Sequence, residues 1–164
     1  MKRIYSLFFG LTICFCVNAQ TFHKYFSQSS SNGDLYRCLQ TSDGGYAAVG
    51  TVNDDFLIIK TDASGTLSWS KKIPFTDSES FTDLVETIGG GLVAVGSSLN
   101  TTSFIMEAVA VKFNAAGAIL WSNSYVGSSG SSSAKRIETD ALGNVYVLGD
   151  ITNGASQDNF IMKL

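Results

Sequence analysis

Short apolar stretches recur along the chain, each preceded by a turn that contains glycine. The segments "TSDGGYAAVG" (41–50), "ETIGGGLVAVG" (86–96) and "ETDALGNVYVLG" (138–149) all follow this pattern and all end in glycine. Apolar runs of four to eight residues bounded by such turns are typical of β-strands. No segment keeps the i, i+3, i+4 spacing of an amphipathic helix over ten residues. The sequence therefore predicts an all-β fold.

A second pattern follows each of these segments. "KTDASGTLSW" (60–69) and "KFNAAGAILW" (112–121) share a lysine, a turn that closes in glycine, and a tryptophan. "NFIMKL" (159–164) aligns with the start of both, so each repeat predicts four strands, named a to d in chain order. Aligned on its threonine, the third repeat has one extra residue in its a–b turn. The residues that align are Thr41, Thr87 and Thr139; Gly50, Gly96 and Gly149; and Lys60, Lys112 and Lys163.

The predicted b strands are apolar without interruption, as in residues 92–95 and 145–148, so we expect both of their faces to be covered. Four antiparallel strands per repeat with such a buried strand describe a β-propeller blade. A tryptophan at one fixed position of each blade can pack into the next blade. The predicted units are a lone closing strand (22–26), two blades (35–73 and 81–125) and an incomplete blade (133–164).

About three blades make an incomplete ring, because propellers have four to eight. The two end blades would then each expose an apolar face, which costs stability and favours association. Two alternatives follow. Either the sequence is part of a longer chain, or two copies complete a six-bladed ring through their exposed blade faces by exchanging the closing strand.

The first residues predict export. Lys2 and Arg3 precede an apolar stretch (4–17) that ends near small residues, which is typical of a Sec signal peptide (1–19). The mature chain, residues 20–164, would be extracellular or on the cell surface, and no membrane span is predicted in it. Without Lys2 and Arg3, nine of the 11 basic residues remain against 14 acidic ones, so the net charge of −5 disfavours nucleic acid as a partner.

Few residues suggest chemistry. His23 has no second histidine as a partner, so no catalytic, metal or cofactor site is predicted. The best candidate is a ligand-binding rim at Asn53, Asp54 and Asp55. We expect the b–c loops at 51–55, 97–107 and 150–158 to form this rim. Cys38, the only cysteine after the signal peptide, cannot form an internal disulfide and is predicted to be a small buried group.

The remaining charged residues receive structural predictions. The three repeated lysines occupy equivalent positions, which favours a structural or solvating role. Asp77, Glu79 and Asp83 are assigned to a d–a connection, around the start of the second predicted blade, and are predicted to be solvated residues.

At this point the motifs resemble a known family. "DALGNVYVLG" followed by "DNFIMKL" resembles the bacterial β-propeller repeat called SBBP. "DDFLIIKTDASGTLSWSKKI" and "AVAVKFNAAGAILWSNSYVG" are similar to related repeats in secreted Bacteroidetes proteins. The resemblance implies a propeller but transfers no catalytic residue.

The function expected from these observations is a secreted or surface-exposed, non-catalytic propeller module. Its partner would be an unidentified protein or glycan, bound at the loops. The alternative is the scaffold part of a larger secreted enzyme, a hydrolase or a quinoprotein-like protein. The G-x-x-x-W element, as in Gly65 to Trp69, is similar to quinoprotein propellers, although the sequence contains no cofactor-binding or calcium cluster.

Overall fold

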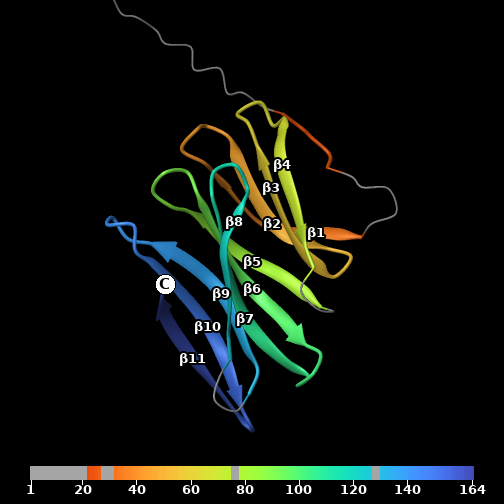
Figure 1. The fold of residues 1–164 in the computed structure, drawn as a ribbon, viewed down its shortest axis with the longest axis vertical. Coiled ribbons are helices and arrows are strands. Elements are labelled where there is room, and N and C mark those ends of the chain that lie inside the picture. Colours follow the sequence, from red (N-terminus) through yellow and green to blue (C-terminus); the bar gives the residue numbers. More distant parts are fainter. Residues whose placement is uncertain (1–21, 27–31, 75–77, 127–129) are drawn as a thin grey trace, which may run out of the picture.

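The computed structural model describes residues 22–26, 32–74, 78–126 and 130–164, which form three antiparallel sheets (Figure 1). The signal peptide predicted at 1–19 lies outside the described residues. The strands are β1 (Gly33–Gln40), β2 (Tyr46–Val52), β3 (Asp55–Thr61), β4 (Leu67–Ile73), β5 (Glu79–Glu86), β6 (Leu92–Asn100), β7 (Ile105–Phe113), β8 (Ile119–Tyr125), β9 (Ser132–Thr139), β10 (Val145–Asn153) and β11 (Ser156–Lys163).

Each sheet is a meander in chain order. The first sheet has the order β1-β2-β3-β4, the second β5-β6-β7-β8, and the third β9-β10-β11. The described residues contain no helix, so the prediction of an all-β fold is confirmed, as is the four-strand repeat for the first two sheets. The described sheets form an open stack, with no closed ring.

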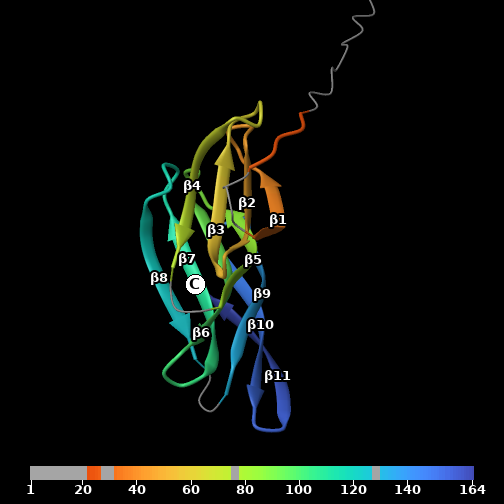
Figure 2. The ribbon, with the colours of Figure 1, turned by 90° about the vertical axis from the view of Figure 1, so that its right-hand side faces the viewer.

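The sheets pack face to face in sequence order. Strand β5 contacts β1, β2 and β3, and β9 contacts β5, β6 and β7. Figures 1 and 2 show the second sheet, in green and teal, between the first sheet in orange and yellow and the third in blue. The second sheet is therefore covered on both faces, whereas the described residues cover the first and third sheets on one face only.

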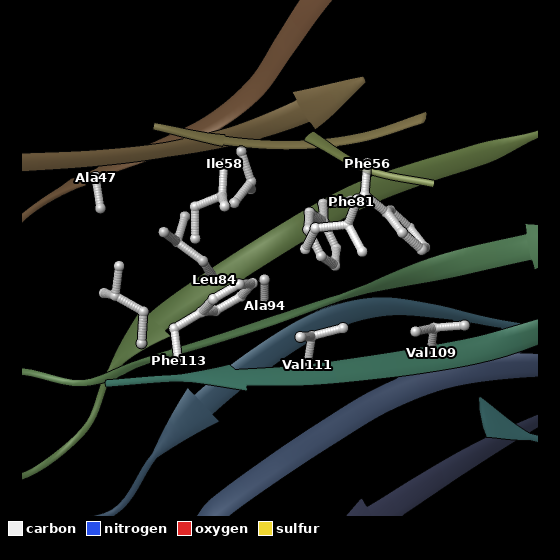
Figure 3. Close-up of a cluster of buried hydrophobic side chains, with 12 residues drawn as sticks. Ala47, Phe56, Ile58, Phe81, Leu84, Ala94, Val109, Val111 and Phe113 are labelled. Atoms are coloured by element: carbon white, nitrogen blue, oxygen red, sulfur yellow. The ribbon is translucent and has the colours of Figure 1, made fainter. Parts of the chain in front are cut away.

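The first hydrophobic core lies between the first and second sheets (Figure 3). The Phe56 and Phe81 rings stack across this boundary with centroids 4.2 Å apart. Figure 3 shows Ala47 and Ile58 of the first sheet pointing toward Phe113 and Val111 of the second. The fully apolar contact explains why these strands are rich in Val, Ile and Phe.

The second core lies between the second and third sheets, and alternate residues of β6 supply both cores. Leu92 and Ala94 belong to the first core, and Val93 and Val95 to the second. The prediction that both faces of strand b are covered is confirmed for β6. It is wrong for β10, where Leu148 is 43% exposed, because no described sheet lies on that face.

The three a–b turns have the same length. In the first two, the threonine amide donates to the carbonyl four residues on, as from Thr41 to Gly45. In the third turn, Asp140 makes this bond to Asn144. The prediction of an extra residue in this turn, based on aligning Thr139, is therefore wrong. Asp140 replaces the threonine and accepts hydrogen bonds from the amides of Leu142 and Asn144.

Trp69 of β4 connects the first sheet to the second, as the repeated tryptophan predicts. Its indole covers Gly117 in the β7–β8 turn, where a Cβ atom would lie 2.7 Å from the ring. The indole N–H donates to the carbonyl of Ala115 at 3.1 Å. Gly117 also has a φ of 80°, so both the ring and the backbone conformation require glycine.

Residues 22–26 do not form the predicted closing strand, because no described strand lies beside them to pair with. Phe22 nevertheless lies over Gly65 in the β3–β4 turn, where a Cβ atom would be 2.5 Å from the ring. This contact matches that of Trp69 with Gly117. Phe22 also contacts the Tyr46 ring edge-on, with centroids 5.3 Å apart.

Cys38 is exposed, so the prediction that it is buried is wrong. It lies opposite Ala48 in the β1–β2 ladder, as Leu84 lies opposite Ala94 in the second sheet. Leu84 is 1% exposed because the first sheet covers it. No described sheet covers the corresponding face of the first sheet, which leaves the thiol in solvent.

Replacement of Phe113 by alanine should lower the free energy of unfolding by about 3–5 kcal/mol, because its ring fills the first core. Ile161→Ala is the matched control. Its side chain is 75% exposed, so the change should stay within about 0.5 kcal/mol. Urea unfolding monitored by circular dichroism measures both values. Equal losses in the two variants would contradict this assignment of the core.

Candidate functional site

The predicted rim residues lie at the β2–β3 turn. Asn53 and Asp54 are its two central residues, with φ angles of 48° and 64°. Two consecutive residues with positive φ describe a type I′ turn, in which Asn and Asp are favoured. The exposed pair therefore has a structural reason to be present, independent of any ligand.

Backbone hydrogen bonds hold this turn against its neighbours. The Asp54 carbonyl accepts from the Glu79 amide at 2.8 Å, and the Asn53 amide donates to the Asn32 carbonyl at 2.8 Å. Asp55 pairs instead with Lys72 of β4. The structure thus keeps Asn53 and Asp54 together on the surface and directs Asp55 into an ion pair within the first sheet.

The other two b–c connections are shorter than predicted. Strands β6 and β7 extend to Asn100 and Ile105, so most of the loop predicted at 97–107 is paired strand. Strands β10 and β11 likewise fill most of 150–158 and leave only Gly154 and Ala155 between them. The predicted bounds of these two loops are wrong, because polar residues such as Ser97 and Ser98 continue the strand ladder.

Phe104 is the largest exposed group at this end of the second sheet. Its side chain is 80% exposed, and its φ is 54°. Asn100 shapes the turn by accepting hydrogen bonds from the amides of Thr102 and Ser103. The rim loop predicted at 97–107 includes Phe104, but the sequence analysis did not single it out. The available signal was a lone aromatic residue in the polar stretch "NTTSF".

The three b–c turns lie at the same end of their sheets, toward the lower side of Figure 1. Asn53 and Asp54 offer amide and carboxylate groups, and Phe104 offers an aromatic face. Such a surface can form hydrogen bonds and stacking contacts with a partner.

The opposite end of the first sheet holds a charged cluster. The Lys60 ammonium, which is almost fully buried, donates to Asp43 Oδ2 at 2.7 Å and to the Thr61 carbonyl at 2.9 Å. The hydrogen bond from Lys60, followed by those from Thr41 and the Gly45 amide, holds the pKa of the Asp43 carboxyl well below its usual range. Ion pairing explains how a lysine is accommodated in this apolar sheet.

The other repeated lysines lack this arrangement. Lys112 lies partly buried opposite Trp121, and the Lys163 ammonium lies 5.7 Å from the centre of the Tyr146 ring. Their turns contain Gly89 and Leu142 where the first turn has Asp43. The repeat therefore keeps the lysine but not its acidic partner. The ion pair with Asp43 gives Lys60 a structural role, in line with the structural or solvating role predicted for the three lysines.

Asp83 and Glu79 are buried, so the prediction that they are solvated residues of a connection is wrong, and Asp77 lies outside the described residues. Asp83 is 2% exposed and bridges all three sheets. Its Oδ1 lies 3.1 Å from Arg37 Nε in β1, and its Oδ2 accepts from the Ile137 amide in β9 at 3.2 Å.

The single histidine lies at the N-terminal end of the described residues. His23 lies in the exposed segment 22–26 with its ring beside Tyr25. Among the described residues, no three His, Cys, Asp or Glu side chains are grouped so that they could hold a metal ion. In the same part of the chain, no helix is long and apolar enough to span a bilayer.

Comparison with models of known protein families finds no match, and comparison with curated proteins finds none either.

Asp54→Val should lower the free energy of unfolding by about 1–2 kcal/mol, because valine tolerates a positive φ poorly. Asp54→Gly should stay within about 0.5 kcal/mol of the natural protein, because glycine adopts this conformation readily. Urea unfolding of both variants tests the structural role of the turn. An equal loss in the glycine variant would mean that the carboxylate itself stabilises the fold.

Asp43→Asn should lower the free energy of unfolding at pH 7 by about 1–3 kcal/mol, because Lys60 loses its charged partner. The pKa of Asp43 is lowered in the fold, so its contribution is present above the ordinary carboxyl pKa of about 4 and is lost as pH falls below it. The variant should lack this part of the pH dependence. Urea unfolding of the natural protein and the variant between pH 7 and 2 measures this pH-dependent part of the free energy of unfolding. The double variant Asp43→Asn with Lys60→Met should be more stable than Asp43→Asn alone, because it no longer buries an ammonium group without its charged partner.

Proposed function

We propose that this protein is an exported, non-catalytic binding module built from β-propeller-type blades, and that it binds a protein or glycan through its b–c turns. The proposal combines the signal-peptide pattern of residues 1–19 with the resemblance of the repeats to secreted SBBP-like proteins. It also relies on the way in which the three described sheets contact one another.

The arrangement of the first strands carries the propeller part of this proposal. Strand β5 contacts β1, and β9 contacts β5, so the first strands of successive sheets meet one after another. In a propeller, the blades meet in this way around a central axis. The buried carboxylate of Asp83 joins the same three strands through Arg37 and the Ile137 amide. This succession favours blades over an unrelated stack of sheets.

The exposed end faces support a larger assembly. Leu148 and Ile161 are cross-strand neighbours in the third sheet, and they are 43% and 75% exposed. Leu35 and Leu67 of the first sheet are each 48% exposed. Apolar surface of this kind is usually covered by protein. Further blades of a longer chain, or a second copy of this chain, would cover it.

The b–c turns are the proposed binding surface because they combine an exposed aromatic ring with polar side chains at one end of the stack. Aromatic residues are enriched where proteins recognise partners, since they bury a large area at little cost in conformational entropy. Phe104 provides the ring, and Asn53 and Asp54 provide hydrogen-bonding groups.

Phe104→Ser should weaken ligand binding about tenfold or more, as expected when an aromatic contact is removed. Leu142→Ser is the control, because Leu142 is 82% exposed but lies in an a–b turn at the opposite end of the sheets. A glycan array probed with the natural protein and both variants measures the effect. No binding by the natural protein would contradict a glycan ligand, and an equal loss in both variants would contradict the proposed surface.

A further inference from the structure

Strand β8 is the outer edge of a complete four-stranded sheet. It pairs with β7 on one side, and within the described residues no strand pairs with its other side. Figure 2 shows β8 at the margin of the structure, with no described element beyond it. An unpaired edge presents backbone N–H and C=O groups that can bond to another strand.

The corresponding edge of the first sheet, β4, carries charge. Lys71 and Lys72 are both exposed there, two and three positions after the tryptophan of β4. Lysine on an edge strand opposes pairing with a further strand. In β8 the residues at the equivalent positions are Asn123 and Ser124, and this strand contains no charged residue. The β8 edge therefore lacks the protection that the β4 edge has.

The sequence of β8 is complementary to itself. In an antiparallel pair of two β8 strands centred on Asn123, Trp121 of each copy lies opposite Tyr125 of the other. Aromatic pairs of this kind stabilise antiparallel sheets. The side-chain amide of Asn123 can both donate and accept, so the two copies of this residue can bond to each other on the two-fold axis.

This register also covers apolar surface that a single copy leaves in solvent. Trp121 and Tyr125 lie on the same face of β8 and are only partly buried against the second core. Leu120 is 56% exposed and Val126 is 53% exposed, and the register brings each toward the other in the second copy. Burial of these groups would favour association.

We propose that two copies of this chain form a dimer by antiparallel pairing of their β8 strands, with the two-fold axis at Asn123. The second sheets of the two copies would join into one continuous sheet. A single strand edge makes a small interface, so the dimer should dissociate on dilution. The dimer uses neither the b–c turns nor the end faces of the stack, so it can fail without affecting the proposed binding surface.

The mass of the purified full chain, measured by size-exclusion chromatography with light scattering at several concentrations, tests the dimer. We expect the mass of two chains at high concentration and of one chain at low concentration. Asn123→Lys should raise the dissociation constant of the dimer about tenfold or more at low ionic strength, because it places two ammonium groups opposite each other.

Ile161→Lys is the matched control. It adds the same charge at a side chain that is 75% exposed on the third sheet, away from β8, and it should leave the dissociation constant unchanged. Both substituted positions are exposed, so both variants should keep the urea midpoint of the natural protein, measured at a concentration where it is a monomer.

Mixing two variants tests the register. Asn123→Asp alone should weaken the dimer as Asn123→Lys does, because like charges again lie opposite each other. An equimolar mixture of the two variants should form a mixed dimer, since residue 123 of one copy lies opposite residue 123 of the other. Hydrogen exchange of the β8 amides should become slower as the concentration of the natural protein rises, while that of the β4 amides stays unchanged.

The mass of one chain at every concentration would overturn the proposal. It would also be overturned by association that Ile161→Lys abolishes and Asn123→Lys leaves intact, because the face of the third sheet would then be the interface. Assemblies that grow beyond two chains, with slowed exchange in β4, would contradict it as well. They would mean that β8 of one copy pairs with β4 of the next, in a contact that does not close.

Discussion

A sheet with apolar side chains on both faces needs a neighbour on each side, and this requirement organises the whole structure. Among the described sheets, only the second meets it, since β6 gives Leu92 and Ala94 to one core and Val93 and Val95 to the other. Burial of apolar area is the main source of stability, so the end sheets contribute less per residue. Exposure of Cys38, Leu148 and Ile161 follows from the same requirement.

Features that depend on neighbours in the chain were predictable from the sequence, and features that depend on packing between sheets were not. Turn glycines and alternating strands are local, so the four-strand repeat was predicted correctly. Burial of Asp83 and exposure of Cys38 depend on which sheet lies opposite. The alignment on Thr139 failed because Asp140 satisfies the same turn bond. Of the candidate rim residues, Asn53 and Asp54 lie exposed in the β2–β3 turn and Asp55 pairs with Lys72, whereas Phe104, inside the predicted loop 97–107, was not singled out.

The contact between an aromatic ring and a turn glycine links each sheet to the next along the chain. Trp69 reaches from β4 to Gly117, and Phe22 reaches from the N-terminal segment to Gly65. In both cases the glycine lets the ring lie directly on the backbone, which buries a large aromatic surface with few ordered side chains. Because the ring precedes the turn that it covers by about one repeat, this contact favours a stack in sequence order.

Charge on the first strands of the three sheets, β1, β5 and β9, adds a second level of specificity to the stack. Arg37, Asp83 and Arg136 hold equivalent positions, opposite Val49, Val95 and Leu148 in their ladders. Arg37 pairs with Asp83 of the next sheet, whereas Arg136 donates to the Lys135 carbonyl. Stacking the first sheet of a second copy on the third sheet would bring Arg37 toward Arg136, and like charges at close range oppose association. A covering sheet with a carboxylate at this position would instead reproduce the pairing of Arg37 with Asp83.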